Sequence, residues 1–212
     1  MKLFGFFLSS AAYRVRIALN LKNIDYEQLS LKLREGEHKQ ADYLAVNPQG
    51  LVPALALSGA ASDTVLFQSM AILEYLEEVY PDPPLLPDHP VRRASVRAVA
   101  DNIACDIHPL NNLRVMIYLK DELGHDDDQV NTWYHHWLKA GFDGVERSIS
   151  ADPYCFGDTA TLADVCLLPQ LYNARRFKFD LEPYPKIRAV EEACLALDAF
   201  DKAYPDNQPD AV

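Results

Sequence analysis

Residues 2–22 read KLFGFFLSSAAYRVRIALNLK, and the pattern of this stretch changes partway along. Residues 2–7 are rich in aromatic side chains and predict a β-strand. Over residues 11–22 the apolar side chains recur at helical spacing on one face, with arginines on another. Ser9 and Ser10 stand between the two and are natural N-cap residues. The chain therefore opens with a strand, a capped turn and a helix.

The next segments continue this alternation of strand and helix. The predicted elements are strands over residues 25–33, 51–57 and 64–67, and helices over residues 37–44 and 70–79. Turn-forming residues 58–63 separate the last two strands, which predicts a hairpin. Ser69 is the predicted N-cap of the last helix. The first two strands are joined by a helix and should be parallel, so the order β-α-β-α-β-β-α predicts a thioredoxin-like domain.

A proline-rich segment follows this domain. Residues 80–90 hold five prolines, which cannot lie in a helix interior. We predict a thioredoxin-like domain over residues 1–81, a linker over 82–90 and a second domain over 91–212. Strand signals nearly vanish in the second domain, so the fold class is α/β plus all-α. Its predicted helices are 91–122, 129–150, 161–177 and 186–203.

Two of these helices carry a recognisable start. Asp126, Asp127 and Asp128 form a short charge run, which we interpret as a solvated loop that starts the following helix, where acids suit the positive end of the dipole. Thr161 followed by Asp164 fits an N-cap with an acid at the third helical position, which we interpret as a folding signal rather than a catalytic one.

The composition limits the partners of the chain. A formal net charge of -11 repels phosphate backbones, so we expect no nucleic-acid partner, and an anionic substrate needs a local arginine. No run of 18 apolar residues occurs, so no membrane span is expected. The four cysteines form no C-x-x-C pair and no H-E-x-x-H motif occurs. We therefore expect free thiols in a cytoplasmic protein, and no metal site.

The first turn and helix carry a more specific signature. Two small hydroxyl residues, small residues, an aromatic residue and then R-V-R-I-A-L resemble the active-site signature of the zeta-class glutathione transferase family. Further matching pieces run in order along nearly the whole chain: Asn47-Pro48-Gln49, Val52-Pro53, Gln68-Ser69, Asp106-Ile107-His108-Pro109-Leu110, Phe156-Gly157-Asp158, Arg176-Phe177 and Asn207-Gln208-Pro209-Asp210.

This resemblance implies a function for the chain. It implies a homodimer with glutathione as cofactor, bound by the thioredoxin-like domain, and a small dicarboxylic acid substrate in the helical domain. The implied reaction is the cis-trans isomerisation of maleylacetoacetate to fumarylacetoacetate. The glutathione thiolate adds to the cis double bond, the new single bond rotates, and the thiolate leaves again.

Ser9 and Ser10 are the predicted catalytic residues. A free thiol has a pKa near ~8.5, so a hydrogen-bond donor and positive potential are needed to hold it as thiolate. A hydroxyl at a helix N-terminus supplies both. By position alone a simple cap is the more common role. The resemblance reverses this order and favours Ser9, with Ser10 close behind. Ala11 stands where many relatives carry cysteine, so no thiol contributes there.

Two dipeptides are predicted to hold glutathione. Pro53 alone would be an ordinary edge-strand proline. The resemblance implies a cis Val52-Pro53 peptide that turns the Val52 backbone outward, where it pairs with the cysteinyl backbone of glutathione like an added strand. Gln68 and Ser69, at the start of a helix, are implied to hold the γ-glutamyl carboxylate.

The remaining site residues are carried over from the resemblance alone. His38 is placed near the glycyl end of glutathione, and His108 and Asn112 are placed as glutathione contacts from the helical domain. Arg176 is the predicted partner of a substrate carboxylate, because a guanidinium binds a carboxylate through two parallel hydrogen bonds. Arg14 is a second candidate, although a structural ion pair is its more ordinary role.

Three alternatives stay open at this point. A maleylpyruvate isomerase is expected to carry extra arginines where this sequence has Leu8 and Leu113, which favours maleylacetoacetate slightly. A transferase acting on α-halo acids is a second alternative. A non-catalytic binding module is a third, although such a module has no need to keep all three glutathione-binding pairs of residues.

Overall fold

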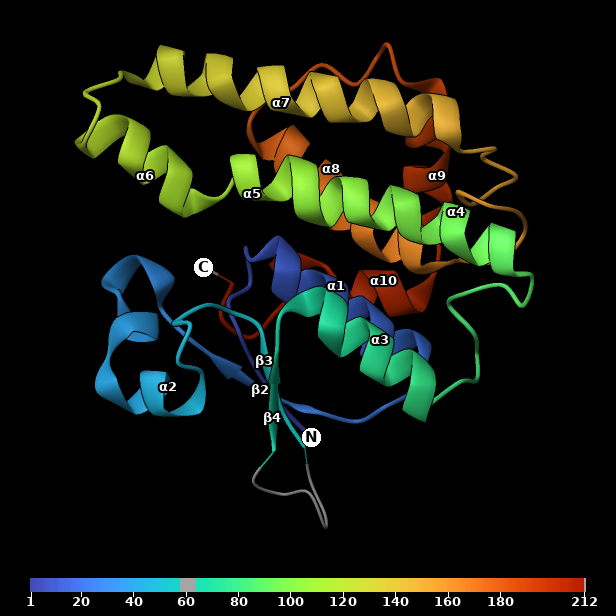
Figure 1. The fold of residues 1–212 in the computed structure, drawn as a ribbon, viewed down its shortest axis with the longest axis horizontal. Helices are drawn as coiled ribbons and strands as arrows, with labels where there is room; N and C mark the ends of the chain where they lie inside the picture. Colours follow the sequence, from blue (N-terminus) through green and yellow to red (C-terminus); the bar gives the residue numbers. More distant parts are fainter. Residues whose placement is uncertain (58–63, 212) are drawn as a thin grey trace. The chain divides into compact units, whose positions relative to one another are not determined.

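The computed structural model describes residues 1–57 and 64–211, and it divides into two compact units (Figure 1). The first unit comprises Met1–Leu85 together with Leu195–Val212, and the second comprises Leu86–Cys194. The change of unit between Leu85 and Leu86 falls inside the proline-rich segment. The predicted hairpin turn, residues 58–63, lies outside the described residues.

The first unit contains a four-stranded mixed sheet. Its strands are β1 (Lys2–Gly5), β2 (Glu27–Ser30), β3 (Ala54–Ala56) and β4 (Val65–Phe67), in the spatial order β2-β1-β3-β4. β1 and β2 are parallel, whereas β3 pairs antiparallel with both β1 and β4. The predicted thioredoxin-like order is confirmed. Each strand is shorter than predicted because the apolar runs extend into the flanking turns.

Helices cover this sheet. They are α1 (Ser10–Leu21), α2 (Ala41–Val46), α3 (Ser69–Val79) and α10 (Asp198–Ala203). α1 lies beside both α3 and α10 (Figure 1). The central leucines Leu3 and Leu55 pair across β1 and β3 and are fully buried. The helix predicted over residues 37–44 is wrong in its bounds: a 3-10 turn, Glu37–Lys39, precedes α2, because Gln40 is extended between them.

The last residues of the chain pack on the first unit, which differs from the expected second domain 91–212. The buried guanidinium of Arg16 donates from Nε to the carbonyl of Ala203 (3.0 Å) and from Nη2 to the carbonyl of Phe7 (3.1 Å). Asp210 accepts hydrogen bonds from the backbone N–H of Phe7 and from Gln28, both at 3.0 Å. These polar contacts, invisible to hydrophobic periodicity, attach the C-terminal segment to β1 and α1.

The second unit is helical. Its elements are α4 (Pro90–Asp101), a π-helical segment (Asn102–Ile107), α5 (His108–Leu110), α6 (Leu113–Asp121), α7 (Asp127–Ser148), α8 (Leu162–Arg176) and α9 (Pro185–Leu195). The single helix predicted over residues 91–122 is interrupted because Pro109 has no N–H and Asn112 caps a new helix. The helix predicted over 186–203 is likewise two helices, α9 and α10, and α10 belongs to the first unit.

The predicted start of α8 is confirmed, whereas α7 begins two residues before the predicted residue 129, so Asp127 and Asp128 lie in its first turn and not in a loop. Asp126 and Gln129 form a capping box at α7, and Thr161 and Asp164 form one at α8. The fully buried Asp164 carboxylate also accepts from the backbone N–H of Cys155 at 2.8 Å. Within residues 1–57 and 64–211, the structure contains no helix of the length and apolarity needed to cross a bilayer.

Candidate functional site in the thioredoxin-like unit

The sheet register brings three turns to the same end of the sheet. Phe4 of β1 lies opposite Ala54 of β3, and Ala54 lies opposite Phe67 of β4. The chain leaves β1 towards Ser9, enters β3 from Val52-Pro53, and leaves β4 towards Gln68-Ser69. Because β3 runs antiparallel to both neighbours, all three connections emerge at the same end of the sheet. The residues of these three turns that we predict to bind glutathione therefore lie at one end of the sheet, where α1 and α3 both begin.

Ser9 combines a capping contact with a free proton. It is the N-cap of α1, and its Oγ accepts a hydrogen bond from the backbone N–H of Ala12 at 3.2 Å. A hydroxyl that accepts in this way keeps its own proton for donation to another group. Ser10 is the first helical residue, is 4% exposed, and its Oγ has no hydrogen-bond partner among the described residues. Capping and thiolate stabilisation are therefore compatible in Ser9.

The turn before β3 is held in place from one side. The Tyr43 hydroxyl (2.6 Å) and the Asn47 amide (2.8 Å) both donate to the carbonyl of Leu51. The Val52-Pro53 peptide bond is cis, as predicted. The backbone N–H and C=O of Val52 make no hydrogen bond to any residue in the described ranges. Val52 therefore presents an unpaired peptide group at this end of the sheet, and pairing with an added extended segment requires such a group.

His38 reaches this turn through the backbone of its 3-10 helix. A Cβ on Gly50 would lie 2.9 Å from the carbonyl oxygen of His38, and Lys39 Nζ donates to the Gly50 carbonyl at 2.9 Å. This close approach needs glycine, which also has a φ of +56°. Burial foremost, and then the positive charge of Lys39, lower the pKa of His38. The imidazole is therefore neutral at pH 7.

The start of α3 corrects one prediction and supports another. Gln68, not Ser69, is the N-cap: its φ is 70°, and its carbonyl accepts the first helical hydrogen bond, from Ile72. Ser69 is the first helical residue and is 6% exposed. The guanidinium Nη1 of Arg14 lies 3.4 Å from the Ser69 hydroxyl. With 1% of its surface exposed, Arg14 supports the α3 start from behind, so a direct substrate contact is not evident.

The predicted residues of the helical unit form two separate groups. His108 Nε2 lies 3.5 Å from the side-chain nitrogen of Asn112, whose Oδ1 caps α6 by accepting from the Arg114 N–H at 3.1 Å. Arg176 is exposed at the end of α8, where Nη1 donates to Asn173 at 3.2 Å. Its guanidinium carbon lies 5.8 Å from the ring centre of Phe177.

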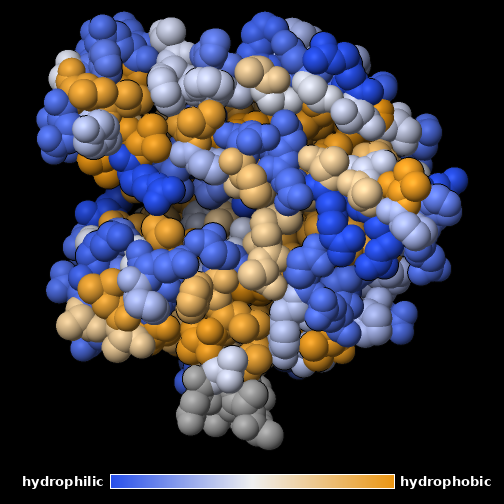
Figure 2. Space-filling model, viewed as in Figure 1, coloured by the Kyte–Doolittle hydropathy of each residue, from blue (hydrophilic) through white to orange (hydrophobic). Residues whose placement is uncertain are grey.

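Phe177 also lines a pocket of about 380 Å³ between α6 and α7. The apolar part of its wall consists of Leu113, Met116, Ile117, Val130 and Phe177. Leu113 and Ile117 are 43% and 48% exposed, and hydrophobic residues reach the surface in this region (Figure 2). The pocket thus joins the position of Leu113 to the ring that contacts Arg176. No group of three or more metal-ligating side chains occurs within the described ranges.

Several supporting residues were missed by sequence reasoning. Tyr43 and Asn47 hold the turn before Val52, and Gln49 accepts a hydrogen bond from Gln68 at 2.6 Å. Asp210 and Arg16 fix the backbone of Phe7, two residues before Ser9. Asn47, Gln49 and Asp210 lie in the matched motifs, so a role for them was readable, although their partners were not.

Family models match both units of the chain. Residues 1–78 match the family model for the glutathione S-transferase N-terminal domain, and residues 138–193 match that for the C-terminal domain. A maleylacetoacetate isomerase of Pseudomonas aeruginosa is 50% identical to this chain, and the match covers 99% of this chain and 98% of that protein. A solved holo structure of a maleylpyruvate isomerase, a bacterial zeta-class glutathione transferase, is 50% identical with a TM-score of 0.95, covering 100% of both chains.

A third comparison carries ligands. The crystal structure of a maleylacetoacetate isomerase from Methylobacterium extorquens AM1, with bound malonate and glutathione, is 40% identical with a TM-score of 0.93 and covers 100% of both chains. This chain therefore belongs to the zeta class of the glutathione transferase family.

Proposed function

We propose that this protein uses glutathione to isomerise maleylacetoacetate, a cis-olefinic dicarboxylic acid, to its trans isomer, fumarylacetoacetate. When bound, glutathione supplies a thiolate that adds reversibly to the double bond and so permits rotation about it. The proposal is carried by what lies at one end of the sheet. The Ser9 hydroxyl with its free proton, the unpaired Val52 peptide group and the N-termini of α1 and α3 are all found there. The relatives named above act on maleyl acids of this kind.

The residues at this end of the sheet fit glutathione chemically. The Ser9 O–H donates to the sulfur and, with the N-terminus of α1, stabilises its negative charge. Ser10 is a second donor at the same turn. The free N–H and C=O of Val52, before Pro53, pair with the cysteinyl backbone. Each of these roles uses a group whose hydrogen-bonding capacity the rest of the unit leaves available.

The ends of glutathione need charged or polar partners. Gln68 and Ser69, at the N-terminus of α3, take the γ-glutamyl carboxylate, and the buried Arg14 adds positive charge behind Ser69. His38 takes the glycyl end through its imidazole, whose Nδ1 has no hydrogen-bond partner among the described residues. From the helical unit, His108 and Asn112 complete the contacts, as a pair already within reach of each other.

For the substrate we propose Arg176 as the carboxylate partner. Among the residues that the structure describes, Asn173 engages one of its five N–H donors, and the others can bind a carboxylate through two parallel hydrogen bonds. Leu113 belongs to the apolar part of the wall of the pocket that Phe177 also lines. A maleylpyruvate isomerase would be better served by an arginine there, so we favour maleylacetoacetate. Maleylpyruvate remains the second candidate, because a relative of that activity is 50% identical.

The test is Ser9→Ala, with Ser10→Ala as the matched variant. Loss of one charge-stabilising donor costs about 10²–10³ in kcat. We expect Ser9→Ala to lower kcat on this scale, to shift the acid limb of the pH–rate profile towards the free thiol pKa near ~8.5, and to change glutathione affinity little. Equal losses of kcat and affinity would mean that Ser9 only shapes the site.

The substrate and the catalytic class need separate measurements. The ratio of kcat/KM for maleylacetoacetate to that for maleylpyruvate assigns the natural acid, and an α-halo acid assay tests transferase chemistry. Retention on a glutathione column without any turnover would favour the non-catalytic module. We further propose a homodimer, by analogy with the family. We propose a cytoplasmic location because the four cysteines form no disulfide. Light scattering during size-exclusion chromatography tests the dimer.

A further inference from the structure

His108 stands at a break in helix geometry. The six residues before it, Asn102–Ile107, form a π-helical segment between α4 and α5. Pro109 explains the irregularity: it lacks an N–H, and in a regular helix its ring would collide with the carbonyl of Cys105, four residues earlier. A wider turn avoids this collision, and such segments recur at functional sites. A wide turn, however, leaves the orientation of His108 to be fixed from outside.

Helix α7 approaches this π segment at a glycine. A Cβ on Gly141 would lie 2.2 Å from both Cγ1 and Cδ1 of Ile107, which is far inside any tolerated contact. Ile107 is 2% exposed, so its side chain has no open space to move into. Gly144, three residues along the same helix, has nothing within 4 Å of its Cβ position. Of these two glycines, only Gly141 is required by packing.

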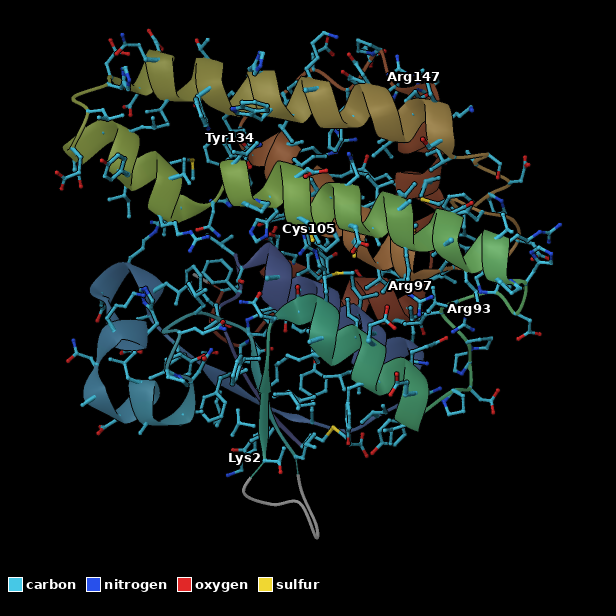
Figure 3. The ribbon with its side chains drawn as sticks, viewed as in Figure 1. Lys2, Arg93, Arg97, Cys105, Tyr134 and Arg147 are labelled. Carbon is cyan, nitrogen blue, oxygen red and sulfur yellow. The ribbon has the colours of Figure 1, made fainter. Side chains whose placement is uncertain are left out.

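Two hydrogen bonds from α7 fix the residues that follow His108. Trp133 Nε1 donates to the carbonyl of Leu110 at 2.8 Å, and the backbone carbonyl of Tyr134 accepts from the side chain of Asn111 at 3.3 Å. Figure 3 labels Tyr134 on α7 and Cys105 in the π segment. Tyr134 and Gly141 are two helical turns apart and therefore lie on the same face of α7. His108 is thus held between a packing contact on one side and two hydrogen bonds on the other.

We propose that Gly141 is a positioning residue, which acts through Ile107 to set the positions of His108 and Asn112. This inference rests on the proposed function, in which those two side chains contact glutathione. Ile107 precedes His108 directly, and its carbonyl accepts from the Asn111 N–H at 3.2 Å. A displaced Ile107 therefore moves the backbone on both sides of His108. The substitution changes no group that touches a ligand.

The experiment compares Gly141→Ala with Gly144→Ala. Both add one methyl group to α7 and both raise helix propensity, and the added methyl group clashes, with Ile107, only at position 141. One readout needs no ligand: the imidazole NMR signals of His108, assigned with a His108→Gln variant. Two others are the glutathione dissociation constant by calorimetry and the separate values of kcat and KM for glutathione.

We expect Gly141→Ala to shift the His108 signals and to weaken glutathione binding about tenfold, which is the scale of losing one hydrogen bond to the ligand. The loss should fall on KM for glutathione more than on kcat. Gly144→Ala should match the parent in every readout. Adding Ile107→Ala to Gly141→Ala removes both clashing atoms and should restore binding.

The possible failures are distinguishable. Unchanged His108 signals in Gly141→Ala, or equal effects of the two glycine substitutions, would overturn the inference. Shifted His108 signals with unchanged glutathione affinity would support the positioning by Gly141 and remove His108 from the proposed function. If Gly141→Ala alone does not fold, the double variant decides: it must fold and bind glutathione like the parent, and its failure to do so would overturn the inference.

Discussion

The attachment of the C-terminal segment makes a prediction about Ser9. Asp210 accepts from the Phe7 N–H and from Gln28, each at 3.0 Å, while the Phe7 carbonyl accepts from Arg16. Both peptide groups that flank Phe7 are therefore fixed by polar side chains, and Ser9 follows two residues later. We expect Asp210→Ala to loosen this turn and so to lower both the stability of the protein and its turnover.

The magnitude follows from the two hydrogen bonds. A hydrogen bond to a charged group contributes about 1.5–3 kcal/mol when it is well shielded. Both contacts of Asp210 are only part-buried, so water replaces part of each one, and we expect a total loss of about 1.5–3 kcal/mol. Asp210→Asn keeps one acceptor oxygen for Phe7 and should lose about half of this.

The assays are urea unfolding followed by circular dichroism and steady-state kinetics at saturating glutathione. We expect kcat to fall about tenfold in Asp210→Ala, because the Ser9 hydroxyl is displaced from the sulfur. Asp25→Asn, an exposed acid in the same unit, is the matched control for the lost charge. Unchanged kcat in Asp210→Ala, or an equal effect of Asp25→Asn, would refute the idea that this segment positions Ser9.

Two further predictions concern titratable groups. The pKa of His38 is lowered by burial and then by Lys39, so the unfolded chain takes up this proton first. The free energy of unfolding should therefore fall as pH drops from about 6.5 through the folded pKa, and His38→Gln should flatten that part of a urea-unfolding pH series. Burial raises the thiol pKa of Cys155 and Cys194, whereas Cys105 is exposed. Iodoacetamide at neutral pH should modify Cys105 alone in the native protein, and mass spectrometry finding a second label would contradict this.

The order of elements in the first unit was predictable because each element carries its own local signal. The alternation of strands and helices predicted the order of elements, and the acidic run 126–128 and the Thr161–Asp164 pair predicted helix starts within two residues of the observed ones. The dipeptides that we predict to hold glutathione were identified through matched motifs. They converge on one end of the sheet because β3 is antiparallel to both β1 and β4; the predicted hairpin implied only its pairing with β4.

What could not be predicted depends on long-range polar contacts and on backbone geometry. Arg14 and Arg16 were expected on a polar helix face, yet both are buried, because their partners lie 55 and 187 residues away. The left-handed conformation of Gln68 moves the cap of α3 by one residue. The π segment before Pro109 leaves no mark in hydrophobic periodicity beyond the proline itself.

The contact between Arg16 and Ala203 also bears on the order of events during synthesis. The ribosome releases the whole helical unit before the residues that complete the thioredoxin-like unit. A domain interrupted in this way must close a long loop around an inserted neighbour, which slows folding. The nascent chain therefore exposes the Arg16 guanidinium without its final acceptor until Ala203 has left the ribosome. Glutathione binding by the nascent protein should accordingly appear only after residues 195–211 have left the ribosome, later than the compaction of the inserted helices.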